Sequence, residues 1–317
     1  MCWKLKGVFV AIALLSCVTV GFANDINFAA LPHTYVGTAF ELNSSYFNGY
    51  AVALTNNGLV TPNGLGGNPY WGSDANPPAG AVWGTTPVNV ASGFTLSFEF
   101  QMSGGWENNA PDPGGGPAGG DGFAFVIQND PSGNEALGRG AGGLGYMYIQ
   151  KSLAVEFDTY MNADWYGDPD GNHIAVNASY YVNGDFNVPH HDCTNGNLMG
   201  PNSTTTDLDV GCTGNPGLVV APVTRLLNDG DIQTAELVYS ADILSLYLNS
   251  DLLFSVHADL TQLLGLQSDP DAYIGFTAGD RNAFQNQDIL FPVPEPATLL
   301  LFSTGLAVLV LRRRRTM

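Results

Sequence analysis

One short segment of the sequence, residues 153–174, holds a dense set of groups that could bind a metal ion. Its start alternates like a β-strand, in which every second side chain shares a face, so Glu156 and Asp158 point the same way. Val155 and Phe157 point the other way and suit a core. Further oxygen and imidazole donors follow at Asn162, Asp164, Asp168, Asp170 and His173. Carboxylates this close raise one another's pKa unless a cation neutralises them. We therefore expect a divalent ion, because oxygen ligands suit calcium and an added imidazole admits a transition metal beside it.

The order of these groups resembles the metal site of the L-type lectins, the legume lectin family with its animal and bacterial relatives. The family pattern is Glu-x-Asp, an aromatic residue two positions on, Asn two beyond it, then Asp-Pro, and His five after that Asp. Every spacing is satisfied, by Glu156, Asp158, Tyr160, Asn162, Asp168, Pro169 and His173. The resemblance implies that Asp158 and Asp168 bridge two metal ions. It also implies that the Tyr160 carbonyl and the Asn162 amide complete a calcium site. Glu156 and His173 would bind the second ion, a transition metal such as Mn²⁺.

Two further segments resemble sugar-binding parts of the same family. Asp121 opens a strand-like run whose aspartate, in the family, accepts hydrogen bonds from two sugar hydroxyls and often follows a cis peptide, here Gly120–Asp121. A glycine loop at residues 139–146 resembles the one whose backbone N–H donates to the sugar. We assign that role to Gly143, with Gly142 as its rival, because glycine permits close approach.

Residues 274–290 resemble the closing strand, specificity loop and final strand of the family. In that loop Gly279 and Asp280 would contact sugar. The resemblance thus implies a carbohydrate site built from Asp121, Gly143, Asn162, Gly279 and Asp280. An aromatic stacking platform could come from Trp106, Trp165 or Tyr166.

The rest of the chain has the pattern of one large all-β domain, and its 39 glycines and 19 prolines argue against a helical bundle. Alternating or apolar runs bounded by Gly, Asn or Asp recur, as in the strands of a sandwich. These runs lie at residues 93–101, 122–128, 144–150, 153–159, 173–181, 233–239, 243–249, 252–257 and 272–277. Only residues 260–266 look helical. With the resemblance, this pattern predicts an antiparallel β-sandwich, a concanavalin-like jelly roll, over residues 24–292.

Residues 1–23 have the pattern of a secretory signal peptide: a basic start, an apolar run over residues 7–20 and a small-residue cleavage site. A lipoprotein signal with acylation at Cys17 is the alternative. Either signal predicts an exported protein.

Residues 293–317 resemble the PEP-CTERM sorting signal of Gram-negative bacteria that make extracellular polysaccharide. A Pro-Glu-Pro triplet at residues 294–296 precedes a short apolar stretch, residues 297–311, and four arginines. The resemblance implies transient membrane anchoring, processing by an exosortase-type enzyme, and release to the cell surface or extracellular matrix. A permanent single-span anchor is the alternative, although the apolar stretch is shorter than the ~20 residues that a bilayer span needs.

Acidic residues outnumber basic ones by 29 to 10, and six of the ten bases lie in the two terminal segments. Binding to phosphate groups needs a basic surface. The charge therefore argues against nucleic acid and anionic lipid as partners, and it is compatible with divalent cations and neutral ligands.

The sequence favours a carbohydrate-binding protein over an enzyme. A laminarinase-type glycoside hydrolase also forms a β-sandwich, but its strand carries a second catalytic glutamate where this chain has Tyr160 and Met161. A calcium loop of the EF-hand type fits poorly, because Ser179 stands where that loop needs glutamate. A surface or matrix protein with a lectin-like fold and no sugar binding is a further alternative. The presence of both Asp121 and Asn162 argues against it.

Cys193 and Cys212 lie in the exported part of the chain, so we predict a disulfide between them. It would close a loop of about twenty residues and stabilise the fold by ~3 kcal/mol. A metal site that includes His190 and His191 is the alternative.

Thiol labelling under denaturing, non-reducing conditions should find no free thiol in protein purified from its native envelope. Two free thiols per mature chain would contradict the disulfide.

Overall fold

The structure, a computed structural model, describes residues 25–42, 49–55, 77–107, 118–162, 168–178, 180–182, 185–187, 197–198, 204–207, 219–281 and 283–292. The predicted signal peptide, the C-terminal segment from residue 293, and both cysteines of the predicted disulfide, Cys193 and Cys212, lie outside these residues. Trp165 and Tyr166 also lie outside them, and the side chain of Trp106 is not described. Within the described ranges, no helix is long and apolar enough to cross a membrane.

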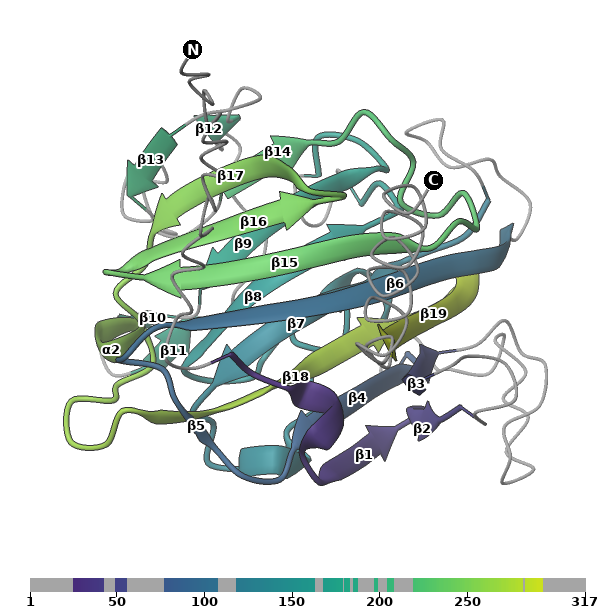
Figure 1. The fold of residues 1–317 in the computed structure, drawn as a ribbon. Coiled ribbons are helices and arrows are strands. Elements are labelled where there is room, and N and C mark those ends of the chain that lie inside the picture. Colours follow the sequence, from purple (N-terminus) through teal and green to yellow (C-terminus); the bar gives the residue numbers. More distant parts are fainter. Residues whose placement is uncertain are drawn as a thin grey trace, which may run out of the picture.

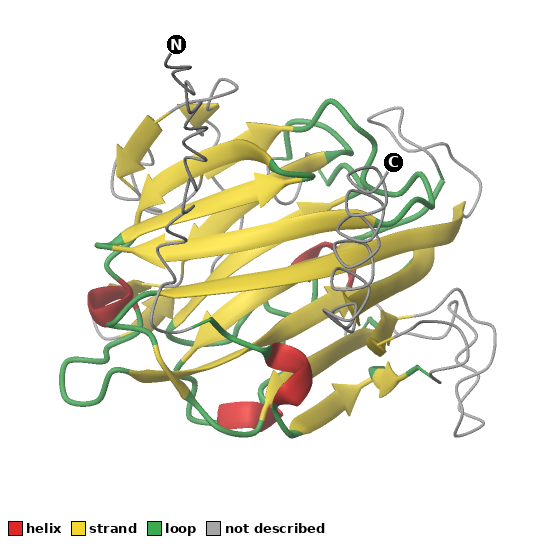
Figure 2. Ribbon diagram, viewed as in Figure 1, coloured by secondary structure: helices red, strands yellow, loops and turns green. Residues whose placement is uncertain are grey.

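The described residues form two large sheets packed face to face (Figure 1), and strands dominate the structure (Figure 2). The first sheet has the order β1-β4-β18-β7-β8-β9-β14-β12, with β5 paired to β18. The second has the order β13-β17-β16-β15-β6-β19-β3-β2. Neighbouring strands are antiparallel except for β12 with β14 and β13 with β17. The predicted antiparallel β-sandwich is therefore confirmed.

The strands of the first sheet are β1 (His33–Gly37), β4 (Ala79–Gly84), β5 (Val88–Asn89), β7 (Gly122–Gln128), β8 (Ser152–Asp158), β9 (His173–Ala178), β12 (Asn197–Leu198), β14 (Val219–Pro222) and β18 (Asp271–Gly279). Those of the second sheet are β2 (Phe40–Glu41), β3 (Gly49–Thr55), β6 (Phe94–Glu107), β13 (Thr204–Asp207), β15 (Gln233–Ser240), β16 (Ile243–Leu248), β17 (Asp251–His257) and β19 (Ala283–Pro292). The short elements are the hairpin β10 (Tyr180–Val182) and β11 (Asp185–Asn187), the 3-10 helices η1 (Phe28–Ala30), η3 (Gly133–Glu135) and η4 (Ala141–Gly143), and the α-helix α2 (Leu260–Leu263).

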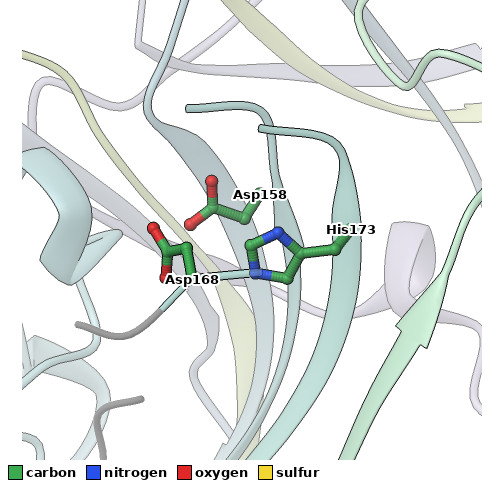
Figure 3. A group of neighbouring side chains, drawn as sticks. All are labelled: Asp158, Asp168 and His173. Atoms are coloured by element: carbon green, nitrogen blue, oxygen red, sulfur yellow. The ribbon is translucent and has the colours of Figure 1, made fainter. Parts of the chain in front are cut away.

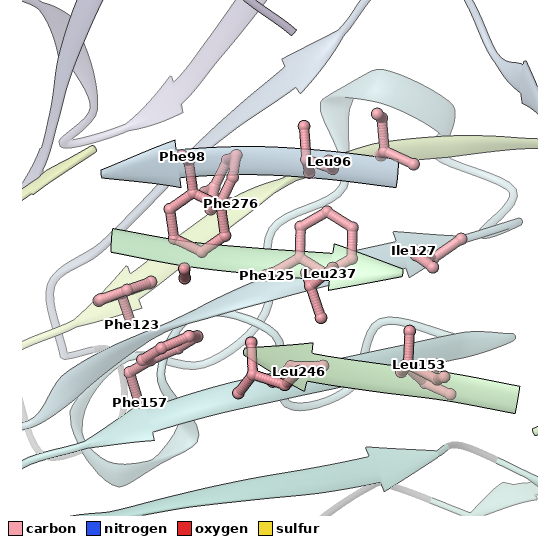
Figure 4. Close-up of a cluster of buried hydrophobic side chains, with 14 of the residues drawn as sticks. Leu96, Phe98, Phe123, Phe125, Ile127, Leu153, Phe157, Leu237, Leu246 and Phe276 are labelled. Carbon is pink, nitrogen blue, oxygen red and sulfur yellow. The ribbon is translucent and has the colours of Figure 1, made fainter. Parts of the chain in front are cut away.

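The core between the sheets is rich in phenylalanine (Figure 4). Phe123 of β7 and Phe157 of β8 stack with ring centroids 4.5 Å apart, and Phe98 of β6 meets Phe276 of β18 edge-on at 4.9 Å. In β15 and β16 buried and more exposed side chains alternate, because only one face of that sheet packs on the core. The strands predicted from alternation at residues 233–239 and 243–249 correspond to β15 and β16.

The first sheet is covered on its other face as well, by residues 129–151. A second apolar cluster fills that space, and it includes Trp83, Leu144, Tyr146 and Ile149. The indole Nε1 of Trp83 donates to the Ala136 carbonyl at 2.8 Å, which fixes this covering segment to β4. Strands β7, β8 and β9 are buried along their whole length for this reason.

The prediction of a strand at residues 144–150 was wrong. This run follows η4 as a series of turns in which Tyr146 N donates to the Gly143 carbonyl and Ile149 N donates to the Tyr146 carbonyl. Leu144 and Tyr148 have φ values of 45° and 81°, which a strand cannot contain. The apolar side chains face the outside of the first sheet, so an alternating pattern arose without strand pairing. The short helical run predicted at 260–266 corresponds to α2.

A half-buried carboxylate on the second sheet, that of Asp288, predicts how stability depends on pH. Burial raises the pKa of Asp288, on β19, to about 7. The unfolded chain ionises this group near pH 4, so the free energy of unfolding falls as pH rises from about 4 to 7 and then levels off. Asp288→Asn removes the cost of the ionised carboxylate at pH 8, about 1–2 kcal/mol, and should therefore raise the melting temperature there by a few degrees. At pH 4.5 it should change the melting temperature little.

Calorimetry at the two pH values checks this expectation. Asp251→Asn removes one exposed carboxylate from the first residue of β17 in the same sheet and serves as the control for net charge. An equal effect of Asp288→Asn at both pH values would contradict the raised pKa of Asp288.

Candidate functional site

Three predicted metal ligands meet where β8 ends and β9 begins. Asp158, the last residue of β8, lies directly opposite His173, the first residue of β9. Asp168 comes from the segment between these strands. Figure 3 shows the three side chains pointing toward one another, and their ligand atoms all lie within 4.8 Å of one another. All three residues are buried, with exposures of 1%, 4% and 0% in the order Asp158, Asp168, His173.

The chemistry of this group fits a divalent cation. Two buried carboxylates with like charges repel each other in a low-dielectric environment, and a cation between them removes that cost. His173 Nδ1 lies 3.1 Å from the Asp170 carbonyl oxygen, which can only accept, so Nδ1 carries the proton. The lone pair is then on Nε2, which is the form in which histidine binds metals. His173 Nδ1 also lies 3.5 Å from Asp170 Oδ1, and this side-chain interaction lowers the pKa of Asp170.

Two backbone N–H groups that follow β8 donate to the two carboxylates. Tyr160 N donates to Asp158 Oδ1 at 2.9 Å, and Asn162 N donates to Asp168 Oδ2 at 2.5 Å. The buried side-chain oxygen Oδ1 of Asn162 has no hydrogen-bond partner among the described residues. A cation held by the carboxylates would offer this oxygen a partner, so the placement of Asn162 agrees with the predicted calcium ligand set.

Glu156 lies outside this group of three, although it shares a face of β8 with Asp158. It is 1% exposed, and its Oε1 accepts a hydrogen bond from the Tyr146 hydroxyl. Asn177 Nδ2 donates in turn to that hydroxyl at 3.0 Å. The role of Glu156 as a ligand of the second ion stays a prediction.

Asp121 lies beside the metal ligands, just before β7, and the Gly120–Asp121 bond is cis, as the resemblance led us to expect. Its carbonyl accepts from both Thr159 N at 2.9 Å and Thr159 Oγ1 at 3.1 Å. Its carboxylate oxygen Oδ2 is buried and has no hydrogen-bond partner within the described part of the chain. Burial and the nearby Asp168 carboxylate raise the pKa of Asp121 to about 8, and Arg281 opposes this shift.

The glycine loop and the closing loop border Asp121 on one side. Asp121 N donates to the Gly279 carbonyl at 3.0 Å, and Ala141 N donates to the Asp280 carbonyl at 3.3 Å. Gly143 is buried and its N–H donates to the Gly140 carbonyl at 3.1 Å, whereas its rival Gly142 is half-buried. The assignment of the sugar-binding N–H to Gly143 therefore stays a prediction, with Gly142 the more exposed of the two.

The side chain of Asp280 points into the sandwich. It is 4% exposed, and Gln287 Nε2 donates to its Oδ1 at 2.7 Å. Burial, together with the charge of Asp121, raises the pKa of Asp280 well above its usual value. Direct contact between Asp280 and sugar stays a prediction, and the structure adds a supporting contact with Gln287 that sequence reasoning missed. Tyr146 was missed in the same way, because no sequence pattern says which carboxylate a buried hydroxyl reaches.

Comparison with known proteins gives two matches to family models. Residues 42–190 match the legume lectin domain, and this range contains the metal ligands, Asp121 and the glycine loop. Residues 292–315 match the PEP-CTERM protein-sorting motif. Both resemblances inferred from the sequence are thereby confirmed.

Several solved lectin structures are similar to this chain. Peanut lectin, solved with a 9mer peptide, is 19% identical, with a TM-score of 0.47, over 84% of this chain and 91% of that one. A seed lectin of Lotus tetragonolobus is 18% identical, with a TM-score of 0.48, over 81% and 89%. The exoplasmic/lumenal domain of VIP36, in a Ca²⁺/Man-bound form, is 14% identical, with a TM-score of 0.45, over 83% and 85%.

Removing divalent metal should destabilise the protein. A ligand that binds only the folded state stabilises it by RT ln(1 + [L]/Kd), ~2.7 kcal/mol at a hundredfold excess over Kd. Excess chelator should therefore lower the melting temperature, and Asp158→Asn should abolish most of the response to added calcium. Asp269→Asn, at an exposed turn before β18, should respond like the parent. An unchanged melting curve in chelator, after metal analysis has verified removal, would reject the metal site.

Proposed function

We propose that this chain, in which a legume lectin domain is followed by a PEP-CTERM protein-sorting motif, is an exported, calcium-dependent lectin that binds carbohydrate without hydrolysing it. One observation carries the proposal. Asp121 and Asn162 each have a buried side-chain oxygen with no hydrogen-bond partner in the described residues, and both interact with the same carboxylate, that of Asp168. Two such oxygens at one end of a sandwich suit a ligand rich in hydroxyl groups together with a cation.

In this proposal the metal ions order the loop that presents the sugar-binding groups. Asp158 and Asp168 would hold both ions, Asn162 and the Tyr160 carbonyl would complete the calcium site, and Glu156 and His173 would hold a second ion such as Mn²⁺. When bound, the cation supplies positive charge that offsets the repulsion between Asp168 and Asp121. The pKa of Asp121 then falls from the raised value of the metal-free protein, and its carboxylate is available as a charged acceptor.

Asp121 would accept hydrogen bonds from two sugar hydroxyls, as its counterpart in the family does. The N–H of Gly143, or of its neighbour Gly142, would donate to the same sugar from the glycine loop. Gly279 and Asp280 complete the proposed site. Their carbonyl groups hold Asp121 and the glycine loop in place through the hydrogen bonds from Asp121 N and Ala141 N.

The sorting motif supports export to the cell envelope or surface. We propose that an exosortase-type enzyme processes the C-terminal segment after transient membrane anchoring, in a Gram-negative bacterium that makes extracellular polysaccharide. That polysaccharide is then the carbohydrate that the released domain would meet at the cell surface.

The proposal excludes hydrolysis because the strand lacks a second catalytic carboxylate. Tyr160 and Met161 occupy the positions where a laminarinase-type hydrolase carries its second glutamate. A structural matrix protein with this fold would bind metal and no sugar. A glycan array with and without chelator separates these functions: calcium-dependent binding supports the lectin, and metal binding without any glycan signal supports the structural protein.

Asp121→Asn should weaken glycan binding while leaving the fold and the metal affinity nearly unchanged. A hydrogen bond to a charged group contributes ~1.5 to 3 kcal/mol, so the expected loss is ~10- to 150-fold in Kd. Asp158→Asn should instead lose metal and sugar together. Titration of the array-selected glycan into each variant measures both effects.

Asp269→Asn, remote from the site, again provides the charge control. Should Asp121→Asn bind the glycan as tightly as the parent does, the proposed site is misplaced. Release of reducing ends from that glycan by the parent would refute the non-enzymatic function.

A further inference from the structure

A buried hydrogen-bonded chain connects the glycine loop to the strand that carries the metal ligands. The Tyr146 hydroxyl donates to Glu156 Oε1 and accepts from Asn177 Nδ2 at 3.0 Å. The three residues come from the covering segment, from β8 and from β9, and none is more than 2% exposed. Because water does not reach these groups, each bond is worth more than its exposed counterpart.

Tyr146 is also part of the turn that carries Gly143. Its backbone N–H donates to the Gly143 carbonyl at 3.0 Å, and its ring packs in the apolar cluster with Trp83 and Ile149. The neighbouring Leu144 carbonyl accepts from Thr277 Oγ1 at 2.8 Å. The tyrosine thus has two attachments, one to the glycine loop through its backbone and one to β8 through its hydroxyl.

The acceptor of that hydroxyl is placed to act on the metal site. Glu156 shares a face of β8 with Asp158, and its partner on β9 is Ala175, two residues from His173. Diagonal neighbours of this kind lie about 7 Å apart, within reach of a glutamate side chain and a shared ion. The bond from Tyr146 to Oε1 restricts the orientation of the carboxylate, and a metal ion would bind through its Oε2. Partners that orient a ligand in this way typically change metal affinity by 10- to 100-fold when removed.

We propose that Tyr146 is a positioning residue that couples the metal site to the glycine loop. Its hydroxyl sets the orientation of Glu156, and its backbone sets the turn of Gly143. The inference rests on the proposed function, because it takes the metal site and the glycine loop as parts of one site. Coupling between two sites is reciprocal, so a metal ion that fixes Glu156 also stabilises the glycine loop.

The test measures metal binding by the full chain and uses no sugar. Mn²⁺ and Ca²⁺ are titrated into the parent and into Tyr146→Phe, and hydrogen exchange of residues 138–147 is followed with and without metal. We expect the variant to bind Mn²⁺ at least tenfold more weakly than the parent. We also expect metal to slow exchange in residues 143–146 of the parent and not of the variant.

Tyr239→Phe is the matched control. The Tyr239 hydroxyl also donates to a carboxylate, Asp242 Oδ1 at 3.0 Å, but on the second sheet. This control should keep the parental affinity and the parental exchange response. Asn177→Ala removes only the donor that orients the Tyr146 hydroxyl, so it should show the same changes to a smaller degree, and it carries the test if Tyr146→Phe does not fold.

Parental Mn²⁺ affinity in Tyr146→Phe, or an unchanged exchange response of its glycine loop, would overturn the coupling and leave the proposed lectin function standing. A parent that binds neither metal would refute the proposed metal site and the coupling together. The two failures are therefore distinguishable in one set of measurements.

Discussion

The repulsion between two buried carboxylates, Asp158 and Asp168, is the constraint on which this site depends. Their ligand atoms lie within 4.8 Å of each other and of His173, in a place that water hardly reaches. Backbone N–H groups of Tyr160 and Asn162 donate to them, but neutral donors offset only part of the cost of two buried charges. A divalent cation, as in the proposed function, would offset the remainder.

The sandwich holds this group together through strand register. Phe157 and Ile174 form one cross-strand pair that faces the core, and Asp158 and His173 form the next pair, which faces the other way. A slip of one residue would exchange the two faces and bury the carboxylate in the phenylalanine core. The stack of Phe157 on Phe123 therefore helps to fix the position of Asp158, the next residue on β8. It also holds β7, which begins directly after Asp121, beside β8. The packing of the core therefore also determines the geometry of the site.

Local sequence patterns made much of the fold and of the candidate site predictable. Asp158, Asp168 and His173 lie on two neighbouring strands and their connection, so residue type and spacing were enough to predict that their side chains meet. The strands with clear alternation, such as β15 and β16, were predicted for the same reason. The run at residues 144–150 was not, because its apolar side chains pack on the outside of a sheet and its left-handed residues include Leu144 and Tyr148. Contacts that depend on how the covering segment folds over the sheet, such as that of Tyr146 with Glu156, have no signature in the sequence.

In the proposed metal site protons and metal ions would compete, and the outcome would decide whether Asp121 donates or accepts hydrogen bonds. Without a cation, burial and the Asp168 carboxylate hold the pKa of Asp121 near 8, so at neutral pH the group carries a proton and offers a donor. A cation between the carboxylates favours the ionised form, in which both oxygens only accept. Asn162 N donates to Asp168 Oδ2, so an ion held by Asp168 would also hold Asn162. In the proposed lectin, metal occupancy would therefore decide both where these polar groups lie and whether Asp121 can accept hydrogen bonds from hydroxyls.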